Sequence, residues 1–157
     1  MELNEYVNVK IITLGSLASG KTTFCLKCFK QTDNVYNGST IGVDYMSGVN
    51  IISNKYIRYK IWDTSGGRMF MQLIKSYYDW CDCILLFCDL TSHDSIKYAL
   101  ELITNYKLNV INIKEKLKVI LICTKNDIIN INNKIYNYFQ DDYREITKML
   151  INNIKIF

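Results

Sequence analysis

The stretch that decides the fold is VNVKIITLGSLASGKT, residues 7–22. Its first half, Val7–Leu14, is mostly apolar and rich in β-branched residues, which predicts a buried strand. A G-x-x-x-x-G-K-T pattern follows directly, from Gly15 to Thr22, and residues 20–31 then have the spacing of a helix. A strand that runs through a glycine-rich loop into a helix is the context in which such a loop binds phosphate.

The chemistry of this loop follows from its backbone. Inward-facing N–H groups and the positive end of the helix dipole attract phosphate oxygens. In this pattern Lys21 reaches the β- and γ-phosphates of a nucleotide, and the Thr22 hydroxyl binds magnesium. The alternative is a chance match in a turn, but strand, helix and Thr22 all stand in the required places. The predicted phosphate contacts are Gly15, Ser16, Leu17, Ala18, Ser19, Gly20, Lys21, Thr22 and Thr23.

Four further apolar segments predict the rest of a mostly parallel sheet. Two of them form a hairpin with a turn at 53–55, which supplies one antiparallel edge strand. The other two are continuous apolar runs, as expected for strands covered on both faces. The hairpin strands are Val43–Ile52 and Tyr56–Trp62, and the buried runs are Cys83–Cys88 and Val119–Cys123.

Helical patterns separate these strands. Ser92 can cap a helix that runs to about Leu108, and residues 141–150 have an amphipathic pattern. The closing residues 151–157 are apolar enough for a last short strand. Strands that alternate with helices predict an α/β fold with helices on both faces of the sheet. Ligands bind such sheets beyond the carboxyl ends of the strands.

The composition indicates one domain over residues 1–157, with 49% hydrophobic and 22% charged residues, and excludes a disordered chain. No apolar run is long enough to span a membrane, and no secretory signal is visible. The net charge is +4, but the lysines are scattered, so we expect no nucleic-acid partner. The three arginines are Arg58, Arg68 and Arg144, and we expect none beside the phosphate-binding loop.

The six cysteines are expected to be reduced, because a chain without an export signal is expected in the cytoplasm. Cys25 and Cys28 form a C-x-x-C pair, which raises the alternatives of a redox or zinc site. Both would lie on one helix face, where small apolar residues pack. No second pair has zinc-finger spacing, so core packing is the favoured interpretation.

The second hairpin strand leads into Trp62-Asp63-Thr64-Ser65-Gly66-Gly67. An aspartate that closes a buried strand beside a phosphate loop can hold magnesium through a water molecule. Gly66 can offer its backbone N–H to a γ-phosphate. The alternative for Asp63 alone is a helix or turn cap, which does not account for the whole set.

The last buried run ends in Thr124-Lys125-Asn126-Asp127. A carboxylate at this point can accept two hydrogen bonds, from the N1–H and the exocyclic amine of guanine, and adenine lacks that donor pair. Asp127 would therefore select guanine, while Lys125 lays its apolar stem along the base. Taken alone the segment could be a simple turn, but its place after a strand favours base recognition.

From about Val7 to Asp127 the chain resembles the Rab branch of the Ras-like small GTPases. This resemblance implies the P-loop NTPase fold, and GTP or GDP with Mg²⁺ as cofactors. Its cofactor-binding residues would be those of the phosphate loop together with Thr40, Asp63, Gly66, Thr124, Lys125 and Asp127. The matching segments beyond the loop and the TKND motif are STIGVDY (39–45), KIWDTSG (60–66), SYY (76–78), ILL (84–86) and DLT (89–91).

The resemblance also implies roles for individual residues and segments. Thr40 would join Thr22 and Asp63 as a magnesium ligand in the triphosphate state. Segments 33–45 and 66–78 would rearrange when the γ-phosphate is lost and would contact effector, exchange or activating proteins. The catalytic positions are Lys21, Thr40, Gly66 and Gly67, and the partner-facing aromatic patch would be Tyr45, Trp62 and Phe70, unless Trp62 is buried in the sheet.

Four residues depart from the family pattern. Gly67 stands where the family has a glutamine that orients the attacking water, and glycine has no side chain to do so. Leu17 replaces a small residue and should crowd an activating protein's arginine. Asp33 falls where an aromatic residue flanks the guanine, with Val35 or Tyr36 as substitutes, and Thr124 replaces the more usual asparagine.

The end of the chain also departs from the family. The last guanine-contacting loop aligns near residues 153–155, where only Lys155 fits. We expect the final helix of the fold to be missing. No cysteine follows Cys123, so we expect no prenyl anchor.

Two functions remain open at this stage. One is a GTPase switch that hydrolyses GTP slowly, with a role in vesicle-trafficking-type signalling. The other is a catalytically impaired binding module that holds GTP or occupies the partners of Rab proteins; Gly67 and Leu17 favour it. A nucleotide kinase is disfavoured, because such kinases neutralise phosphates with several arginines.

Overall fold

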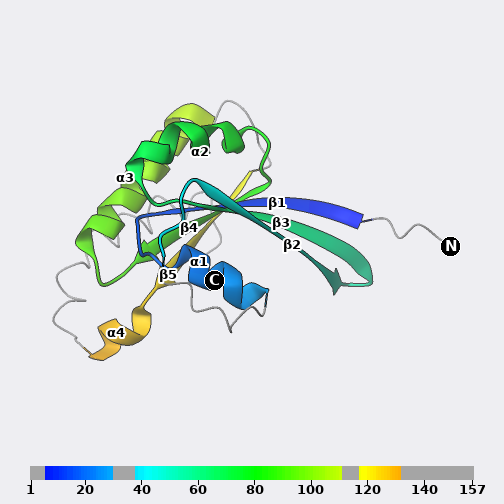
Figure 1. The fold of residues 1–157 in the computed structure, drawn as a ribbon, viewed down its shortest axis with the longest axis horizontal. Coiled ribbons are helices and arrows are strands. Elements are labelled where there is room, and N and C mark those ends of the chain that lie inside the picture. The colour runs from blue at the N-terminus through cyan, green and yellow to red at the C-terminus, as the bar shows by residue number, and fades with distance from the viewer. Residues whose placement is uncertain (1–5, 30–37, 111–116, 132–157) are drawn as a thin grey trace.

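In the computed structural model the chain forms a five-stranded sheet with helices on both faces (Figure 1). The structure describes residues 6–29, 38–110 and 117–131. The strand order is β2-β3-β1-β4-β5, and only the β2–β3 pair is antiparallel. The predicted α/β fold, mostly parallel with one antiparallel edge strand, is therefore confirmed.

The central strand is β1 (Tyr6–Gly15), which pairs in parallel with β3 (Lys55–Thr64) on one side and β4 (Cys83–Asp89) on the other. The sheet then continues to β5 (Lys118–Thr124), which is parallel to β4. Because these four strands run in the same direction, their carboxyl ends meet at one edge. Ligands bind at this edge in sheets of this kind.

The edge strand β2 (Val43–Ile52) joins β3 through a two-residue turn. Ser53 and Asn54 both have positive φ, 50° and 61°, as in the hairpin turns whose twist matches that of the strands. The turn is shorter than predicted, because Lys55 already pairs with Ile52 across the hairpin.

Helices α2 and α3 lie together on one face of the sheet, and α1 lies against the other (Figure 1). Ser92 caps α3 as predicted, since its hydroxyl accepts the backbone N–H of Ser95 at 3.3 Å. The sequence analysis did not predict α2, whose Ile74 is buried in the core. The helical segments are α1 (Lys21–Cys28), the 3₁₀ turn η1 (Arg68–Phe70), α2 (Met71–Tyr78), α3 (His93–Val110) and α4 (Asn126–Ile131).

The hydrophobic core lies between the sheet and the α2–α3 layer. Alternate residues of β1 and β4 point toward these helices, as the two-residue period of a strand requires. Packing of such side chains out of water is the main source of stability for a domain of this size. The core residues from the strands are Ile12, Leu14, Ile84, Leu86, Cys88 and Leu121, and those from the two helices include Ile74, Ile96, Ala99 and Leu102.

The helix predicted over residues 20–31 is shorter in the structure. Gly20 has φ 89° and precedes α1, and the helix ends at Cys28. The predicted strands and the α3 helix agree with the structure to within two residues at each end; β3, for example, begins one residue earlier and ends two later than predicted. The helix predicted at 141–150 and the strand predicted at 151–157 lie outside the described residues.

The two cysteines of the C-x-x-C pair have different surroundings. Cys25 is buried, as predicted, whereas Cys28 is exposed, so the prediction that both pack in the core is wrong for Cys28. Burial raises the pKa of the Cys25 thiol to about 12 and also raises that of Cys28. A raised pKa disfavours the reactive thiolate. Across the described ranges no group of three or more His, Cys, Asp and Glu side chains could hold a metal ion.

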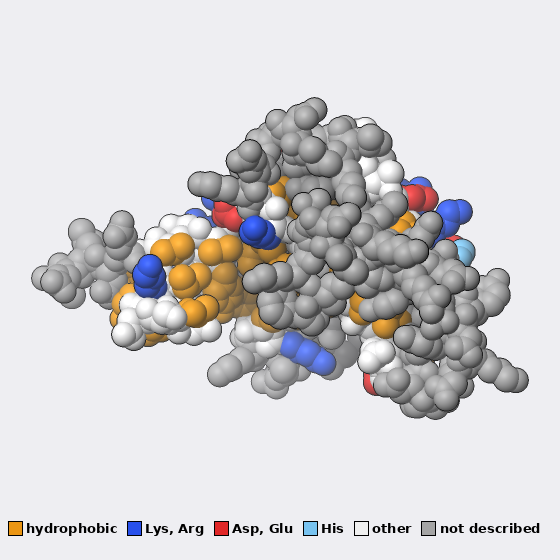
Figure 2. All heavy atoms as spheres, turned by 180° about the vertical axis from the view of Figure 1, so that it is seen from behind, with side chains coloured by type: hydrophobic (Ala, Val, Ile, Leu, Met, Phe, Trp, Pro, Cys, Tyr) orange, Lys and Arg blue, Asp and Glu red, His pale blue; other side chains and the backbone are white. Residues whose placement is uncertain are grey.

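Hydrophobic side chains also lie open to solvent at the hairpin end of the sheet. Figure 2 shows such side chains gathered on this extended part of the molecule, on the side away from the view of Figure 1. The exposed hydrophobic residues of this region lie on the edge strand and at the start of β1, which is level with the hairpin turn. None of the described helices is long and apolar enough to cross a membrane. The exposed residues include Tyr6, Val7, Val49, Ile51 and Ile52.

We expect Gly15→Ala to lower the free energy of unfolding by more than about 2 kcal/mol, through backbone strain and overpacking. Gly15 has φ 144°, and a Cβ there would lie 2.5 Å from the carbonyl oxygen of Phe87. The matched control is Gly42→Ala, where φ is 74° but nothing lies within 4 Å. The control should lose only about 1 kcal/mol, from strain alone. Urea denaturation measures both, and equal losses would contradict the packing argument.

Candidate functional site

A cavity of about 860 Å³ opens at the carboxyl edge of the sheet. It runs from the loop after β1 to the residues that follow β5. The residues that line it include Leu17, Ala18, Ser19, Gly20, Lys21, Thr22, Thr23, Thr40, Gly66, Thr124, Lys125 and Asp127. Twelve of the sequence-predicted site residues therefore meet in one cavity, although they come from distant parts of the chain.

The loop that follows β1 curls back on itself at the mouth of this cavity. Ala18 and Gly20 have positive φ, 56° and 89°. The Ser19 hydroxyl donates to the Ser16 carbonyl at 2.8 Å, and the first turn of α1 closes with the Phe24 N–H on the Gly20 carbonyl at 2.9 Å. This conformation places the loop at the N-terminus of α1, where the helix dipole favours an anion.

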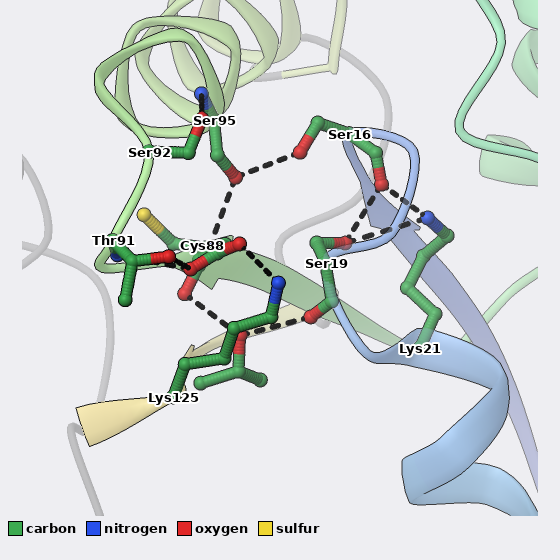
Figure 3. Close-up of polar contacts among 10 residues, drawn as sticks. Ser16, Ser19, Lys21, Cys88, Thr91, Ser92, Ser95 and Lys125 are labelled. Carbon is green, nitrogen blue, oxygen red and sulfur yellow. Dashed lines mark hydrogen bonds and ion pairs between the residues drawn. The ribbon is translucent and has the colours of Figure 1, made fainter. Parts of the chain in front are cut away.

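Lys21 lies folded into the loop that it follows (Figure 3). Its ammonium donates to the carbonyl oxygens of Gly15 at 3.1 Å and Ser16 at 2.7 Å. Burial lowers the pKa of Lys21 to about 8, although the negative charge of Asp63 opposes this shift. The buried cation is thus held by backbone carbonyls next to the space where an anion would bind.

Three oxygen-bearing side chains meet beside the loop. The Thr22 hydroxyl donates to Asp63 Oδ2 at 2.6 Å and lies 2.9 Å from the Thr40 hydroxyl, which itself is 3.4 Å from the same oxygen. Thr13 donates to the other carboxylate oxygen at 2.9 Å. Burial raises the pKa of Asp63, which is 0% exposed, while the hydrogen bonds from Thr22 and Thr13 oppose the shift.

This cluster fits magnesium. Mg²⁺ prefers oxygen ligands and is usually bound by one or two carboxylates together with phosphate oxygens of the substrate. The Thr22 and Thr40 hydroxyls line the phosphate end of the cavity, and the buried Asp63 carboxylate, which does not itself line it, accepts hydrogen bonds from both. Thr13, which the sequence analysis did not single out, orients the carboxylate from β1.

The opposite end of the cavity is formed by the residues after β5. Thr124 donates its hydroxyl to the carbonyl of Ser19 at 2.9 Å, so this segment is tied directly to the phosphate loop. Lys125 has φ 59° and an ammonium 2.5 Å from Asp89 Oδ2. Asp127, in the first turn of α4, is exposed and lines the cavity.

Asp89 is a site residue to which the sequence analysis gave no role. It closes β4 and accepts hydrogen bonds from the N–H and hydroxyl of Thr91, at 2.9 and 2.7 Å, as well as from Lys125. Burial alone would raise the pKa of Asp89, but the hydrogen bonds from Lys125 and Thr91 hold it below its ordinary value. The sequence did contain a signal for Asp89, because an aspartate at the carboxyl end of a buried apolar strand is the same pattern that identified Asp63.

A second polar chain links the phosphate loop to α3 (Figure 3). The Ser16 hydroxyl donates to that of Ser95 at 2.7 Å, and Ser95 in turn accepts the backbone N–H of Asp89 at 3.0 Å. Ser95 is 2% exposed. The loop is therefore held by β4, β5 and α3 together, which restricts its conformation.

The two consecutive glycines after β3 differ in their packing. A Cβ at Gly66 would collide with the backbone of Ser16 and Leu17, so this glycine lies directly against the phosphate loop. A Cβ at Gly67 would meet the ring of Phe70 at 3.4 Å and the Ser65 hydroxyl at 3.5 Å, both ordinary contact distances. Only Gly66 lines the main cavity.

Gly67 lines a second cavity of about 520 Å³, which adjoins the first. Leu17 and Gly66 line both, and Arg68 lines the second. The expectation that no arginine lies beside the phosphate loop is therefore wrong for Arg68. The 3₁₀ turn that begins at Arg68 turns its side chain toward α3, and the sequence pattern gave no sign of this turn.

Leu17 is 57% exposed at the boundary of the two cavities, where the sequence analysis expected it to obstruct an incoming side chain.

The aromatic patch is partly formed. Trp62 is half-buried, with its ring 5.1 Å from that of Tyr45, which is exposed. Phe70 is half-buried and packs against the core. The guanine-flanking candidates at 33–36 and the loop at 153–155 lie outside the described residues.

The phosphate loop, the oxygen cluster and the residues beyond β5 define a nucleotide-binding protein of the P-loop class. The chain belongs to the Ras family, whose model matches residues 10–153. The resemblance to its Rab branch is also confirmed, because its curated relatives include several Rab proteins.

The relatives are matched at modest identity. The Ras-related protein Rab-4 of Dictyostelium discoideum is 34% identical over 124 residues, which cover 76% of this chain and 57% of that protein. RabP of the same organism is 32% identical over 128 residues, 82% of this chain and 53% of that protein. The Ras-related protein RHN1 of Nicotiana plumbaginifolia is 29% identical over 93 residues, 59% and 46% respectively. The chain thus spans about half the length of these relatives.

We expect Asp89→Asn to lower the free energy of unfolding at pH 7 by about 1–2 kcal/mol, through loss of the charged hydrogen bonds to Lys125 and Thr91. The pKa of Asp89 is lowered on folding, so its contribution is present above the ordinary aspartate range and is lost as the pH falls through its folded value. The difference between wild type and variant should therefore shrink on acidification.

Urea denaturation between pH 7 and pH 3 measures this difference. Asp79→Asn is the matched control, because it removes an exposed carboxylate at the end of α2. A difference between wild type and Asp89→Asn that stays constant over this pH range would contradict the assigned role of the carboxylate.

Proposed function

We propose that this protein is a guanine-nucleotide-binding molecular switch that holds GTP or GDP with magnesium and hydrolyses GTP slowly. One observation carries the proposal: a single cavity has a phosphate loop and an oxygen cluster at one end and Asp127 at the other. This is the arrangement that a nucleoside triphosphate requires. Membership of the Ras family supports a GTPase switch in general.

At the phosphate end, the chain supplies charge and hydrogen-bond donors. The backbone N–H groups of residues 16–22 and the N-terminus of α1 would bind the phosphate oxygens. The ammonium of Lys21 would turn from the Gly15 and Ser16 carbonyls toward the phosphates, and Gly66 would donate its N–H to the γ-phosphate. Thr22, Thr40 and Asp63 would hold magnesium, which neutralises phosphate charge when bound.

At the base end, Asp127 would accept the N1–H and amine of guanine. Asp89 keeps the Lys125 ammonium in place, so the lysine stem is available to the base. Thr124 adds no base contact in this proposal. Its hydroxyl instead joins this end of the cavity to Ser19 of the phosphate loop, so that both ends of the nucleotide would meet a connected site.

Hydrolysis should be slow because Gly67 has no side chain to orient the attacking water. Lys21, the magnesium site and the backbone N–H groups would still stabilise the charge of the transferring phosphoryl group. Leu17 would obstruct an arginine from an activating protein at the boundary of the two cavities. The protein should therefore respond weakly to such activators.

The switch would act on partners through segments 33–45 and 66–78, which contain Thr40 and Gly66. Loss of the γ-phosphate removes the contacts of both residues, which would release the two segments. Because the chain is similar to Rab proteins, we assign it a role of the vesicle-trafficking type in the cytoplasm. Exposed Tyr45 and half-buried Trp62 offer an aromatic surface for effector, exchange or activating proteins.

A second candidate function is favoured by Leu17 and Gly67 together. If both defects abolish turnover, the protein would act as a GTP-bound binding module that occupies the partners of Rab proteins. Nucleotide binding is common to both functions, so only the rate of hydrolysis distinguishes them.

We expect the protein to bind GTP and GDP at least about tenfold more tightly than ATP and ADP, because an unpaired buried or base-contacting polar group costs more than 1 kcal/mol. Asp127→Asn should abolish this preference, and Asp79→Asn should leave it unchanged. Competition against a fluorescent guanine nucleotide measures the preference. Equal affinity of the wild type for ATP and GTP would refute the assignment of Asp127.

We expect Gly67→Gln to raise the single-turnover rate of GTP hydrolysis by about tenfold or more. The reason is that a side chain positioned to act on the attacking water raises the rate by at least this factor. A Cβ at Gly67 has only ordinary contacts, so the substitution introduces no clash at the backbone. Leu17→Gly should instead restore the response to a Rab-type activating protein. A wild-type rate as high as that of an activated GTPase would mean that another residue positions the water.

A further inference from the structure

Arg68 lies beside the phosphate site, yet nothing in the proposed function uses it. Its guanidinium is 2.8 Å from Glu101 Oε2 and stacks on the ring of Tyr98, 5.1 Å from the ring centre. Both partners belong to α3. The side chain lines the second cavity together with Gly67, whose missing side chain is the main defect of the catalytic site.

The backbone next to Arg68 is held against the phosphate loop. Gly66 packs so closely on Ser16 and Leu17 that no Cβ fits there, and Arg68 follows two residues later. The second cavity, about 520 Å³, has Ser16, Leu17 and Gly66 on its phosphate-loop side. Leu17 and Gly66 also line the phosphate cavity, so a long side chain at position 68 begins two residues after the shared boundary at Gly66.

The contacts that hold Arg68 on α3 are weak enough to be exchanged. The side chain of Arg68 is 71% exposed and that of Glu101 38%, and ion pairs between exposed side chains contribute little to stability. Gly66 is fixed by its packing on Ser16 and Leu17, whereas Gly67 has only ordinary contacts and gives the backbone before Arg68 conformational freedom. A bound γ-phosphate, with its higher charge, would compete effectively with Glu101 for the guanidinium.

We propose that Arg68 is a further catalytic residue, which leaves Glu101 and binds the γ-phosphate oxygens in the transition state of GTP hydrolysis. This inference rests on the proposed function and deepens it. The water oxygen forms a bond to the γ-phosphorus while the bond to the β–γ bridging oxygen breaks. GDP and inorganic phosphate are released, and the proton lost by the water goes to the released phosphate.

Arg68 remains protonated throughout and only stabilises charge. An arginine at this point would supply from within the chain the positive charge that Leu17 hinders a partner from supplying. Arginines that contact the transferring phosphoryl group raise the rate by about 10³- to 10⁵-fold in related chemistry. Because Gly67 leaves the water unpositioned, the gain here should fall at or below the lower end of that range.

The test compares Arg68→Ala with Arg58→Ala, which removes the same charge from β3, where Arg58 stacks on Tyr6. Three quantities are measured for each: affinity for GDP, affinity for GDP with magnesium and aluminium fluoride, and single-turnover hydrolysis of GTP. Aluminium fluoride mimics the planar phosphoryl group, so its binding reports transition-state contacts without turnover. Glu101→Gln is added, because it removes the ion pair that holds Arg68 on α3.

Arg68→Ala should slow hydrolysis and weaken binding of the aluminium fluoride complex by at least about tenfold, with GDP affinity unchanged. Arg58→Ala should change none of the three, and Glu101→Gln should speed hydrolysis. Equal values for Arg68→Ala and Arg58→Ala would overturn the role of Arg68 while leaving the proposed function intact. Slow hydrolysis in Glu101→Gln, matching Arg68→Ala, would also overturn it, because the ion pair itself would then be the active feature. A wild type that binds no guanine nucleotide would instead refute the proposed function.

Discussion

The phosphate site depends on one constraint: the carboxylate of Asp63 is fully buried, so its charge must be compensated from within the protein. Burying a carboxylate is costly unless hydrogen bonds or a cation compensate. Here Thr13 from β1, Thr22 from α1 and Thr40 from the segment before β2 all lie against it. One buried charge therefore joins three separate parts of the chain, and it does so where a divalent cation would complete the neutralisation.

The other end of the cavity also contains a buried carboxylate, but the charge of that carboxylate is compensated in a different way. Asp89 is also buried, but it has a cation of its own in Lys125. Its ion pair is complete without any ligand, so this end of the site is preformed. The Asp63 carboxylate instead accepts its hydrogen bonds from hydroxyls, and Lys21 interacts with it through charge. The base end thus acts as a fixed support, and the phosphate end is where ligand binding changes the electrostatics most.

The main features of fold and site were predictable because they depend on short-range patterns. Apolar runs located the strands, and the rule that ligands bind at their carboxyl ends brought Lys21, Asp63 and Asp127 together. What was missed depends on tertiary contacts: the exposure of Cys28 is decided by what packs against α1, and the position of Arg68 by a 3₁₀ turn that shows no periodicity. Asp89 carried a usable signal, but its partner Lys125 is distant in sequence.

The open edge of the sheet has a consequence for the behaviour of the protein in solution. Strand β2 (Val43–Ile52) is an edge strand of the described sheet, and its only charged residue is Asp44. Val49 and Ile51 stay exposed on it. Natural proteins usually protect such an edge with lysine, proline or a bulge, because an unprotected edge is a template for pairing between molecules. Self-association should therefore begin at this strand as the protein is concentrated, and a single lysine in place of Val49 would oppose it.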